Sequence, residues 1–291
     1  ISECLVGSEM CIRDRYISDL DGTLLNDSAE LSEKSRQLLN CATENGTMFT
    51  AATARTLASA RVILKGLTLK IPIILMNGVL IYDFNAEEYI FKAVLGTDTV
   101  KKIISALREC AADAFMYTIE KNSMHTYYER LSGQVMLDFY NERRVKYYKS
   151  FTQTEDFLSL DGKNIIYFTV IAPYERLAPL YKRVSEIDDI EISFYSDYYS
   201  KEIWYIEIFS AEASKRKAVQ YLRKLIMPER IVCFGDNLND LPMFEEADKS
   251  IAVKNAVSQV RARADEIIGA NTENSVAQYI YSRSAAVCTD K

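Results

Sequence analysis

Hydrophobic positions along the chain alternate between short β-rich runs and longer amphipathic stretches of helical length. The short runs predict strands and the amphipathic stretches predict helices. The predicted strands of this pattern are 16–19, 48–53, 71–76, 231–234 and 250–253, and the predicted helices are 32–46, 56–65, 214–226, 238–247 and 273–281. Because strands and helices alternate, we expect an α/β fold with a Rossmann-like parallel sheet core and helices on both faces.

The pattern changes over residues 88–209, where predicted strands outnumber helices. The elements predicted there are strands at 114–119, at 164–172 and around Ile192 and Trp204, and helices at 100–110 and after Pro173. Runs of strands with few helices are typical of an α+β unit. We therefore expect a core domain in two segments, 16–87 and 210–283, an α+β cap domain inserted between them at 88–209, and a frayed tail at 284–291.

Composition and charge narrow the functional classes. Hydrophobic residues make up 48% and charged residues 26% of the 291 residues, which is typical of a globular protein. No apolar run approaches the roughly 20 residues that a membrane span requires. The formal net charge of -6 leaves no basic surface for nucleic acid or an anionic membrane. We therefore expect a soluble protein that binds neither nucleic acid nor a membrane; the sequence gives no indication of its oligomeric state.

Cysteine spacing and the first residues bear on the compartment. The six cysteines have no paired C-x-x-C spacing, which argues against a disulfide framework or a zinc site and fits reduced thiols in a cytoplasm. Residues 1–15 lack the basic start and apolar stretch of a signal peptide. Within them, CLVGSEMCIRDR resembles a translated sequencing adapter. We expect a non-native leader over 1–15, a native start near Tyr16 and a cytoplasmic protein.

The strongest chemical signal is the segment DLDGTLL at residues 19–25, where the first predicted strand ends. Its carboxylates, Asp19 and Asp21, lie two residues apart on a turn that Gly22 permits. Ligands of open α/β sheets bind at such strand ends. One carboxylate can attack phosphorus, while the other protonates the leaving oxygen and later deprotonates the attacking water.

Two other interpretations of this acidic segment are open. Five residues match positions 1, 3, 5, 9 and 12 of a calcium-binding loop: Asp19, Asp21, Thr23, Asp27 and Glu30. The sixth position of that loop requires glycine for its sharp turn, and here it is Leu24; the segment also follows a strand start instead of a helix. This disfavours a calcium loop. An ordinary acidic turn is the second alternative.

Two more positions are suited to an anion. Thr53 ends the second predicted strand, where a hydroxyl and a helix-start amide suit a phosphoryl oxygen, although a threonine at such a junction often serves only as an N-cap. Lys215 lies near the start of the helix after the cap, where its ammonium can neutralise charge shared by nucleophile and substrate. Alternatively, Lys215 joins Arg216 and Lys217 on a solvated helix face.

The segment GDNLND at residues 235–240 follows the apolar strand 231–234. Carboxylates of Asp19 and Asp236, a backbone carbonyl of Asp21 and several waters would supply the octahedral oxygen ligands that Mg²⁺ prefers. Asp-rich turns of this kind also cap helices. The segment therefore predicts either a metal site or a helix cap.

These four segments together resemble the motifs of the haloacid dehalogenase-like superfamily, and more narrowly of its Cof-type sugar-phosphatase-like branch. DLDGTLL resembles the first motif, ATAR with Thr53 the second, SKRKA with Lys215 the third and GDNLND the fourth. The resemblance extends from Tyr16 to Tyr281 and includes Asn77-Gly78 and the large cap between the second and third motifs.

The resemblance implies a Mg²⁺-dependent phosphatase that hydrolyses a small phosphorylated metabolite through an aspartyl-phosphate intermediate. It implies that Asp19 is the nucleophile and a metal ligand, and that Asp21 is the acid/base and binds the metal through its carbonyl. Thr53, Ala54 and Lys215 would bind phosphate, and Asn239 would contact phosphate or substrate. Asp236 and Asp240 would complete the metal site, Asp240 either directly or through a water, and Asp240 would also orient Lys215 or that water. The chain departs from the family pattern at three places. Ala54 replaces the usual glycine and can crowd the phosphate. Arg216 follows the lysine where glycine is common, and the segment NTENSVA lacks the usual glycine before valine.

The cap is expected to close over the site and to set specificity. We favour packing or a surface hydrogen bond for His125 over a substrate contact. The cap tyrosines form either a sugar-stacking wall or sheet packing, and we favour packing. These tyrosines are Tyr127, Tyr128, Tyr140, Tyr147, Tyr148, Tyr195, Tyr198 and Tyr199. Arg143 and Arg144 either bind a second anionic group or form an exposed basic turn.

Two rival functions stay open. A phosphomutase would return the phosphoryl group from Asp19 to another hydroxyl of the same sugar, and the motifs do not separate it from a phosphatase. A non-catalytic module that binds a phosphorylated ligand is the third interpretation. The resemblance leaves the substrate open among sugar phosphates, pyridoxal phosphate and flavin mononucleotide.

Overall fold

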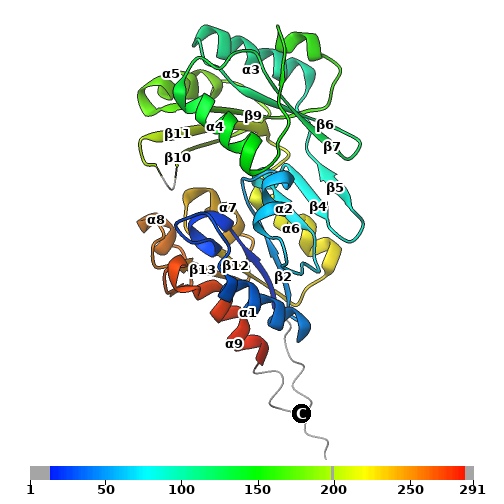
Figure 1. The fold of residues 1–291 in the computed structure, drawn as a ribbon, viewed down its shortest axis with the longest axis vertical. Helices are drawn as coiled ribbons and strands as arrows, with labels where there is room; N and C mark the ends of the chain where they lie inside the picture. Colours follow the sequence, from blue (N-terminus) through cyan, green and yellow to red (C-terminus); the bar gives the residue numbers. More distant parts are fainter. Residues whose placement is uncertain (1–13, 198–199, 286–291) are drawn as a thin grey trace, which may run out of the picture.

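The computed structural model describes residues 14–197 and 200–285, and these form two parts stacked along the long axis of the molecule (Figure 1). Most of the expected leader (1–15) and of the expected tail (284–291) lies outside the described residues. Within the described ranges, no helix combines the length and apolar character that crossing a bilayer demands.

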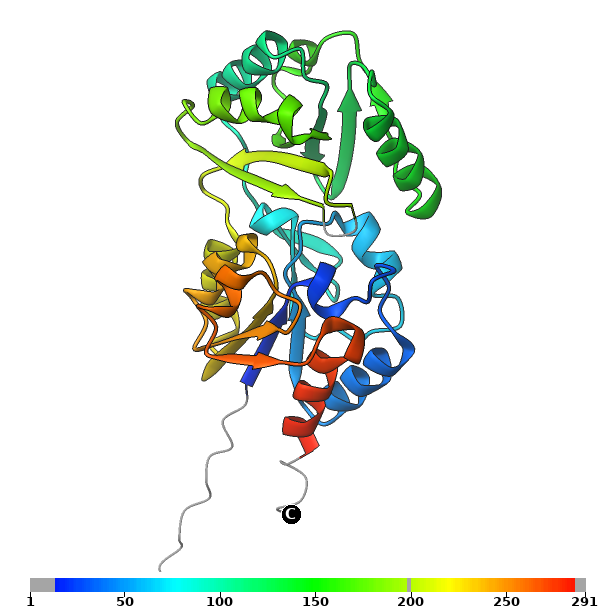
Figure 2. The same ribbon diagram turned by 90° about the vertical axis from the view of Figure 1, so that its left-hand side faces the viewer.

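The lower part is built on a five-stranded parallel sheet with the strand order β14-β13-β12-β1-β2. Its strands are β1 (Asp14–Ser18), β2 (Met48–Ala51), β12 (Arg230–Gly235), β13 (Lys249–Val253) and β14 (Glu266–Ile268). Helices α1 (Glu33–Glu44) and α9 (Ser275–Ala285) pack together on one face, and α6 (Lys215–Ile226) and α7 (Leu241–Phe244) on the other (Figure 2). The predicted parallel sheet with helices on both faces is confirmed.

The run Ile231 to Phe234 in β12 is fully buried. A strand covered by helices on both faces has no solvent side, so its sequence is continuously apolar instead of alternating. β1 lies between β12 and β2, and its last residues, Ile17 and Ser18, are also fully buried. This packing fixes the positions of the carboxyl ends of the two strands, and the candidate site residues Asp19 and Asp236 directly follow these ends.

A second, antiparallel sheet of three strands was not expected. It contains β3 (Ile73–Leu75), β4 (Leu80–Asp83) and β5 (Glu88–Lys92). The predicted strand 71–76 therefore does not extend the parallel sheet, because β3 contacts it only through a bridge between Ala52 and Ile74. β5 lies inside the range expected for the cap but pairs with β4. The predicted helix 56–65 is the shorter α2 (Leu57–Ile63).

The upper part is the cap, a six-stranded sheet with the order β10-β11-β9-β6-β7-β8. Its strands are β6 (Phe115–Glu120), β7 (Ser123–Tyr128), β8 (Thr152–Gln153), β9 (Ile165–Pro173), β10 (Ile190–Ser196) and β11 (Ile203–Ser210), and its helices are α3 (Thr97–Glu109), α4 (Gln134–Lys146) and α5 (Tyr174–Val184). All pairs are antiparallel except β7 with β8. Sequence patterns did not predict β7, β8 or α4.

Short elements complete the chain. They are a π-helical turn at Leu20–Leu24, 3-10 turns at Met76–Gly78, Phe157–Leu160, Leu238–Asp240 and Asn271–Glu273, and the short helix α8 (Ser258–Arg261). The predicted helix 238–247 is thus divided between a 3-10 turn and α7. The turn at its start is stabilised by a capping box in which Asn237 and Asp240 bond to each other's backbone.

Alternation along β11 gives the cap two different faces. Ile206 and Ile208 are fully buried in a hydrophobic cluster with side chains of α3 and α5. The residues between and before them, Tyr205 and Glu207, line a cavity on the side of the core. Because successive strand residues point to opposite faces, the same strand builds the interior of the cap and the roof of the cavity.

Candidate active site

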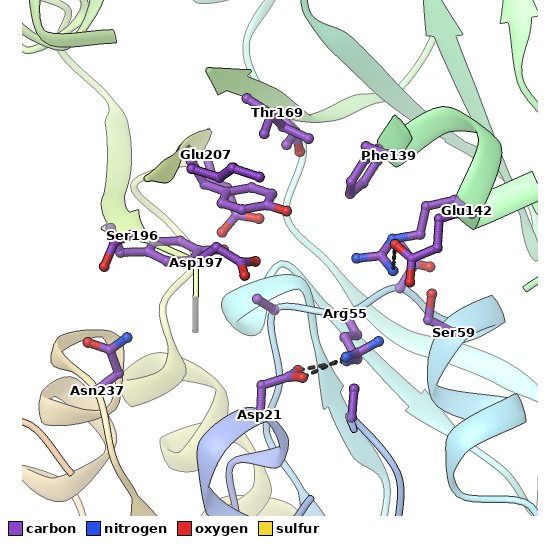
Figure 3. Close-up of a pocket in the computed structure, with 18 of the residues that line it drawn as sticks. Asp21, Arg55, Ser59, Phe139, Glu142, Thr169, Ser196, Asp197, Glu207 and Asn237 are labelled. Atoms are coloured by element: carbon purple, nitrogen blue, oxygen red, sulfur yellow. Dashed lines mark hydrogen bonds and ion pairs between the residues drawn. The ribbon is translucent and has the colours of Figure 1, made fainter. Parts of the chain in front are cut away.

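A cavity of about 580 Å³ separates the cap from the core. Figure 3 shows Asp21 and Arg55 on the core side of this cavity, facing Thr169, Glu207 and Phe139 on the cap side. Residues that directly follow strands β1 and β12 also line it. The cavity therefore lies at the carboxyl ends of the central strands, which is where ligands bind in open α/β sheets.

Three carboxylates from two distant parts of the chain meet at this edge. Asp19, Asp236 and Asp240 each place one carboxylate oxygen within 4.8 Å of the others, and all three are buried. Burial raises the pKa of Asp19 to about 8; the charges of Asp240 and Asp21 act in the same direction, and Lys215 opposes them. Burial and the charges of Asp240 and Asp19 also hold the pKa of Asp236 well above its usual range.

This donor set fits a hard divalent cation. Like charges this close disfavour simultaneous ionisation of the carboxylates, and a bound cation would reverse that preference. Oxygen-only ligands suit Mg²⁺ and Ca²⁺ better than a transition metal. The calcium-loop interpretation finds no support, because its later positions, Asp27 and Glu30, are exposed and do not belong to this carboxylate cluster.

Lys215 lies at the centre of the buried charges. Its Nζ donates to Asp19 Oδ1 at 2.6 Å and to Asp240 Oδ1 at 2.7 Å, and the residue is 2% exposed. Burial lowers the pKa of Lys215, but the two carboxylates outweigh burial and raise it overall. The solvated-face alternative is therefore wrong for Lys215, whereas Arg216 and Lys217 beside it are exposed.

Asp240 is held by the backbone of its own turn. Its Oδ2 accepts hydrogen bonds from the N–H groups of Asp236 at 2.9 Å and Asn237 at 3.1 Å, while its Oδ1 accepts from Lys215. Both oxygens therefore already have donors. This arrangement favours orientation of Lys215 over direct metal binding as the task of Asp240.

Two glycines permit the close approaches that form the site. Gly78 has φ +97°, and a Cβ there would lie 2.2 Å from the carbonyl oxygen of Ser214, directly before Lys215. A Cβ at Gly235 would lie 2.6 Å from the Cβ of Asp240. Only glycine fits at both positions, because one needs left-handed backbone and each needs the space of a missing side chain.

The other predicted site residues are divided between the cavity wall and the layer beneath it. Asp19, Asp21, Ala54, Asp236 and Asn239 line the cavity. Thr53 is 1% exposed, and its Oγ1 accepts a hydrogen bond from the N–H of Arg55 at 3.1 Å. That bond stabilises the turn after β2, whereas the N-cap of α2 is Thr56.

Arg55 is a site residue that the sequence patterns did not single out. Its Nε donates to Asp21 Oδ2 and its Nη2 to Asp21 Oδ1, both at 2.6 Å (Figure 3). Its Nη1 donates to the hydroxyl of Tyr147, just after α4 of the cap, at 3.1 Å. A bidentate guanidinium fixes the orientation of a carboxylate. The available signal was an arginine two residues after a candidate phosphate-binding threonine.

Glu207 was also missed. Its Oε2 accepts a hydrogen bond from Asn77 Nδ2 at 2.8 Å, and it is 5% exposed. Burial raises the pKa of Glu207 to about 7, while hydrogen bonds from Tyr167, Tyr195 and Asn77 oppose the increase. The signal in the sequence was a single acid within the apolar strand WYIEIF, since an unpaired acid is rarely buried.

The structure also places the cap residues whose roles were open. His125 is exposed on β7 and does not line the cavity, which agrees with a surface position. Tyr195 lines the cavity and stacks on Tyr205 with 5.5 Å between ring centroids. Arg143 lines the cavity, whereas Arg144 does not. Tyr198 and Tyr199 lie outside the described residues.

Three comparisons with known proteins show what the chain is similar to. A model of the haloacid dehalogenase-like hydrolase family matches residues 16–280. The pyridoxal phosphate phosphatase YbhA of Escherichia coli is 27% identical, covering 91% of this chain and 96% of its own length. The 5-amino-6-(5-phospho-D-ribitylamino)uracil phosphatase YcsE of Bacillus subtilis is 26% identical, covering 90% and 92%. A solved haloacid dehalogenase-like hydrolase from B. subtilis superposes with a TM-score of 0.75 at 24% identity, covering 91% and 98%.

Proposed function

Because the chain belongs to the haloacid dehalogenase-like hydrolase family, whose matched relatives are phosphatases, we propose that it is a Mg²⁺-dependent phosphatase acting on a small phosphorylated metabolite through an aspartyl-phosphate intermediate on Asp19. The observation that carries this proposal is the buried contact of Lys215 with Asp19 beside the carboxylate of Asp236. In a complex with substrate, the nucleophile Asp19, the positive charge of Lys215 and the cation site at Asp236 would surround the same phosphorus atom.

In the first step, a carboxylate oxygen of Asp19 attacks phosphorus and the bond from phosphorus to the ester oxygen breaks. The leaving oxygen takes the electron pair of that bond and a proton from Asp21. Arg55 keeps Asp21 in position through its two 2.6 Å hydrogen bonds. This bidentate pair favours the ionised form of Asp21. The first step therefore requires that substrate binding loosen the pair, so that Asp21 can take up from solvent the proton that it donates.

In the second step, water attacks the phosphorus of the aspartyl phosphate, Asp21 accepts a proton from that water, and the bond between phosphorus and the Asp19 oxygen breaks. Lys215 neutralises charge on the peripheral oxygens in both steps. The carboxylates of Asp19 and Asp236, with the backbone carbonyl of Asp21, would hold Mg²⁺, whose charge screens the phosphate oxygens from Asp19. Asp240 acts through Lys215, which it orients.

Size and homology both support a small metabolite as the substrate. The cavity of about 580 Å³ lies within the usual range for small-molecule sites. The two curated relatives are named for pyridoxal phosphate and for a phosphorylated ribitylamino-uracil. We propose that this chain also acts on a soluble monoester in which the phosphate is attached to a primary carbon.

The decisive experiment compares the wild-type protein with Asp19→Asn on a panel of phosphorylated metabolites and p-nitrophenyl phosphate, with Mg²⁺ titrated against EDTA. We expect phosphate release by the wild type with Mg²⁺, none with EDTA, and a fall of more than about 10³-fold in Asp19→Asn. Asp98→Asn, an exposed acid on α3 of the cap, is the matched control.

Each rival function gives a different result. A phosphomutase would convert a hexose phosphate into an isomer without releasing phosphate. A binding module would leave every ester intact. Substantial turnover by Asp19→Asn would remove Asp19 from the mechanism while leaving the family assignment in place.

A further inference from the structure

Lys149 is a buried basic side chain in the wall of the same cavity, and the proposed chemistry does not use it. It lies between α4 and β8 in the cap and is 6% exposed. Its Nζ donates to the hydroxyl of Tyr117 at 3.3 Å and lies 4.3 Å from the centroid of that ring and 5.1 Å from the centroid of Phe151. Its surroundings are therefore aromatic.

The partners of Lys149 differ from those of the two cavity arginines, and Lys146, the other lysine that lines the cavity, is exposed. Arg55 is paired with Asp21, and Arg143 donates to Glu142 at 3.1 Å. Among the described residues, no carboxylate oxygen lies within 4.0 Å of Lys149 Nζ. An ammonium removed from water without an anion is costly, and one neutral hydrogen bond with two ring contacts offsets only part of that cost. Burial accordingly lowers the pKa of Lys149 well below its usual range, and the charge of Arg143 adds to the effect.

Taking the phosphatase function above as a premise, we propose that Lys149 forms a second anion subsite, so that the substrate carries a further anionic oxygen group on its leaving group. That group, a carboxylate or a second phosphate, pairs with Lys149 while the transferred phosphate lies at Asp19. Both residues line one continuous cavity. The anion supplies the charge partner that Lys149 lacks in the protein alone.

Neighbouring side chains indicate what connects the two anions. Thr169 and Glu207, which lie on adjacent cap strands, line the same cavity and offer hydroxyl and carboxyl groups. Such groups bond to the hydroxyls of a polyol. The resulting substrate class is a phosphorylated sugar acid or a sugar bisphosphate.

The test measures binding by calorimetry in protein carrying Asp19→Asn with Mg²⁺, so that the result does not depend on turnover. One pair of probes is 6-phosphogluconate and sorbitol 6-phosphate, which differ only by a carboxylate in place of a hydroxymethyl group. The other pair is fructose 1,6-bisphosphate and fructose 6-phosphate. We expect the protein to bind the more anionic member of at least one pair about 10 to 100 times more tightly, and the pair that responds identifies the anion.

Adding Lys149→Met should remove this preference, and Lys182→Met, which removes an exposed lysine from α5 of the cap, should keep it. Lys149→Gln provides a second variant if the first does not fold, and melting temperatures check both. The proposal is overturned if neither pair shows a preference, or if the preference persists without Lys149. A preference found in a protein that releases no phosphate from any ester would support the subsite and reject the phosphatase proposal.

Discussion

The carboxyl group of Glu207 provides a stability test of the roof of the cavity. Its pKa is raised from 4.5 to about 7, first by burial. The folded state therefore favours the protonated form, and ionisation of Glu207 costs folding free energy. Below about pH 4.5 the group is protonated in both states and there is no cost. As the pH rises to 7 the cost grows, and above pH 7 it stays constant.

The size of the effect follows from the shift. Each pKa unit corresponds to about 1.4 kcal/mol, so the shift of Glu207 costs about 3 kcal/mol at pH 8 and less than about 1 kcal/mol at pH 5. Glu207→Gln keeps an acceptor for Asn77 Nδ2 but cannot ionise. We expect Glu207→Gln to have a higher free energy of unfolding than the wild type at pH 8. The difference between the two proteins should be about 2 to 3 kcal/mol larger at pH 8 than at pH 5.

The assay is urea unfolding at pH 5, 6, 7 and 8. Trp204, the single tryptophan of the chain, lies three residues before Glu207 in β11 and packs against Phe194, so its fluorescence reports unfolding of the cap. Glu202→Gln makes the same chemical change at an exposed position next to β11 and should show no such trend. A difference between Glu207→Gln and the wild type that is constant from pH 5 to pH 8 would refute the raised pKa.

Two further substitutions test the core side of the cavity. Lys215→Met should lower kcat by about 10²- to 10³-fold, because it removes the cation that contacts Asp19, whereas Arg216→Met at the exposed neighbour should leave steady-state kinetics unchanged. Gly78→Ala should reduce both phosphatase activity and the free energy of unfolding, the latter by more than about 2 kcal/mol, because the new Cβ would overlap the carbonyl of Ser214. Gly162→Ala, at φ +88° with no atom within 4 Å of its Cβ, should cost only about 1 kcal/mol, and equal effects of the two substitutions would refute the close-approach argument.

The core half of the site was predictable because its information is local. Asp236 follows the continuous apolar run Ile231 to Phe234, which is typical of a covered strand. Asp19 follows the less apolar strand β1, in which only Tyr16 and Ile17 are hydrophobic, and β1 pairs directly in parallel with β12. The carboxyl ends of neighbouring parallel strands meet at one edge. The strand assignment placed both residues at the same edge of the sheet, and the resemblance of the four motifs to one family brought them into one site; that β1 and β12 are direct neighbours came from the structure.

Contacts between distant segments were not predictable in the same way. Arg55 meets Asp21 only after β1 and β2 pair and both turns fold back, and Tyr147 reaches Arg55 from the cap. Nothing in the spacing of these residues specifies such distances. The prediction that residues 71–76 extend the parallel sheet was wrong for a related reason. β3 is as apolar as a core strand, but the turn at Asn77 directs the chain into an antiparallel hairpin with β4.

We expect the proposed chemistry and the choice of substrate to depend on different parts of the chain. Asp19, Lys215 and Asp236 lie on strand ends and a helix start in the core, so we expect their arrangement relative to one another not to depend on the cap. The cap contributes Glu207 through alternation along β11 and Lys149 through the segment after α4. The other face of the same strand, with Ile206 and Ile208, holds the cap together. We therefore expect substitutions at the cavity-facing positions of the cap to change which leaving group binds, while the interior of the cap and the core chemistry are preserved.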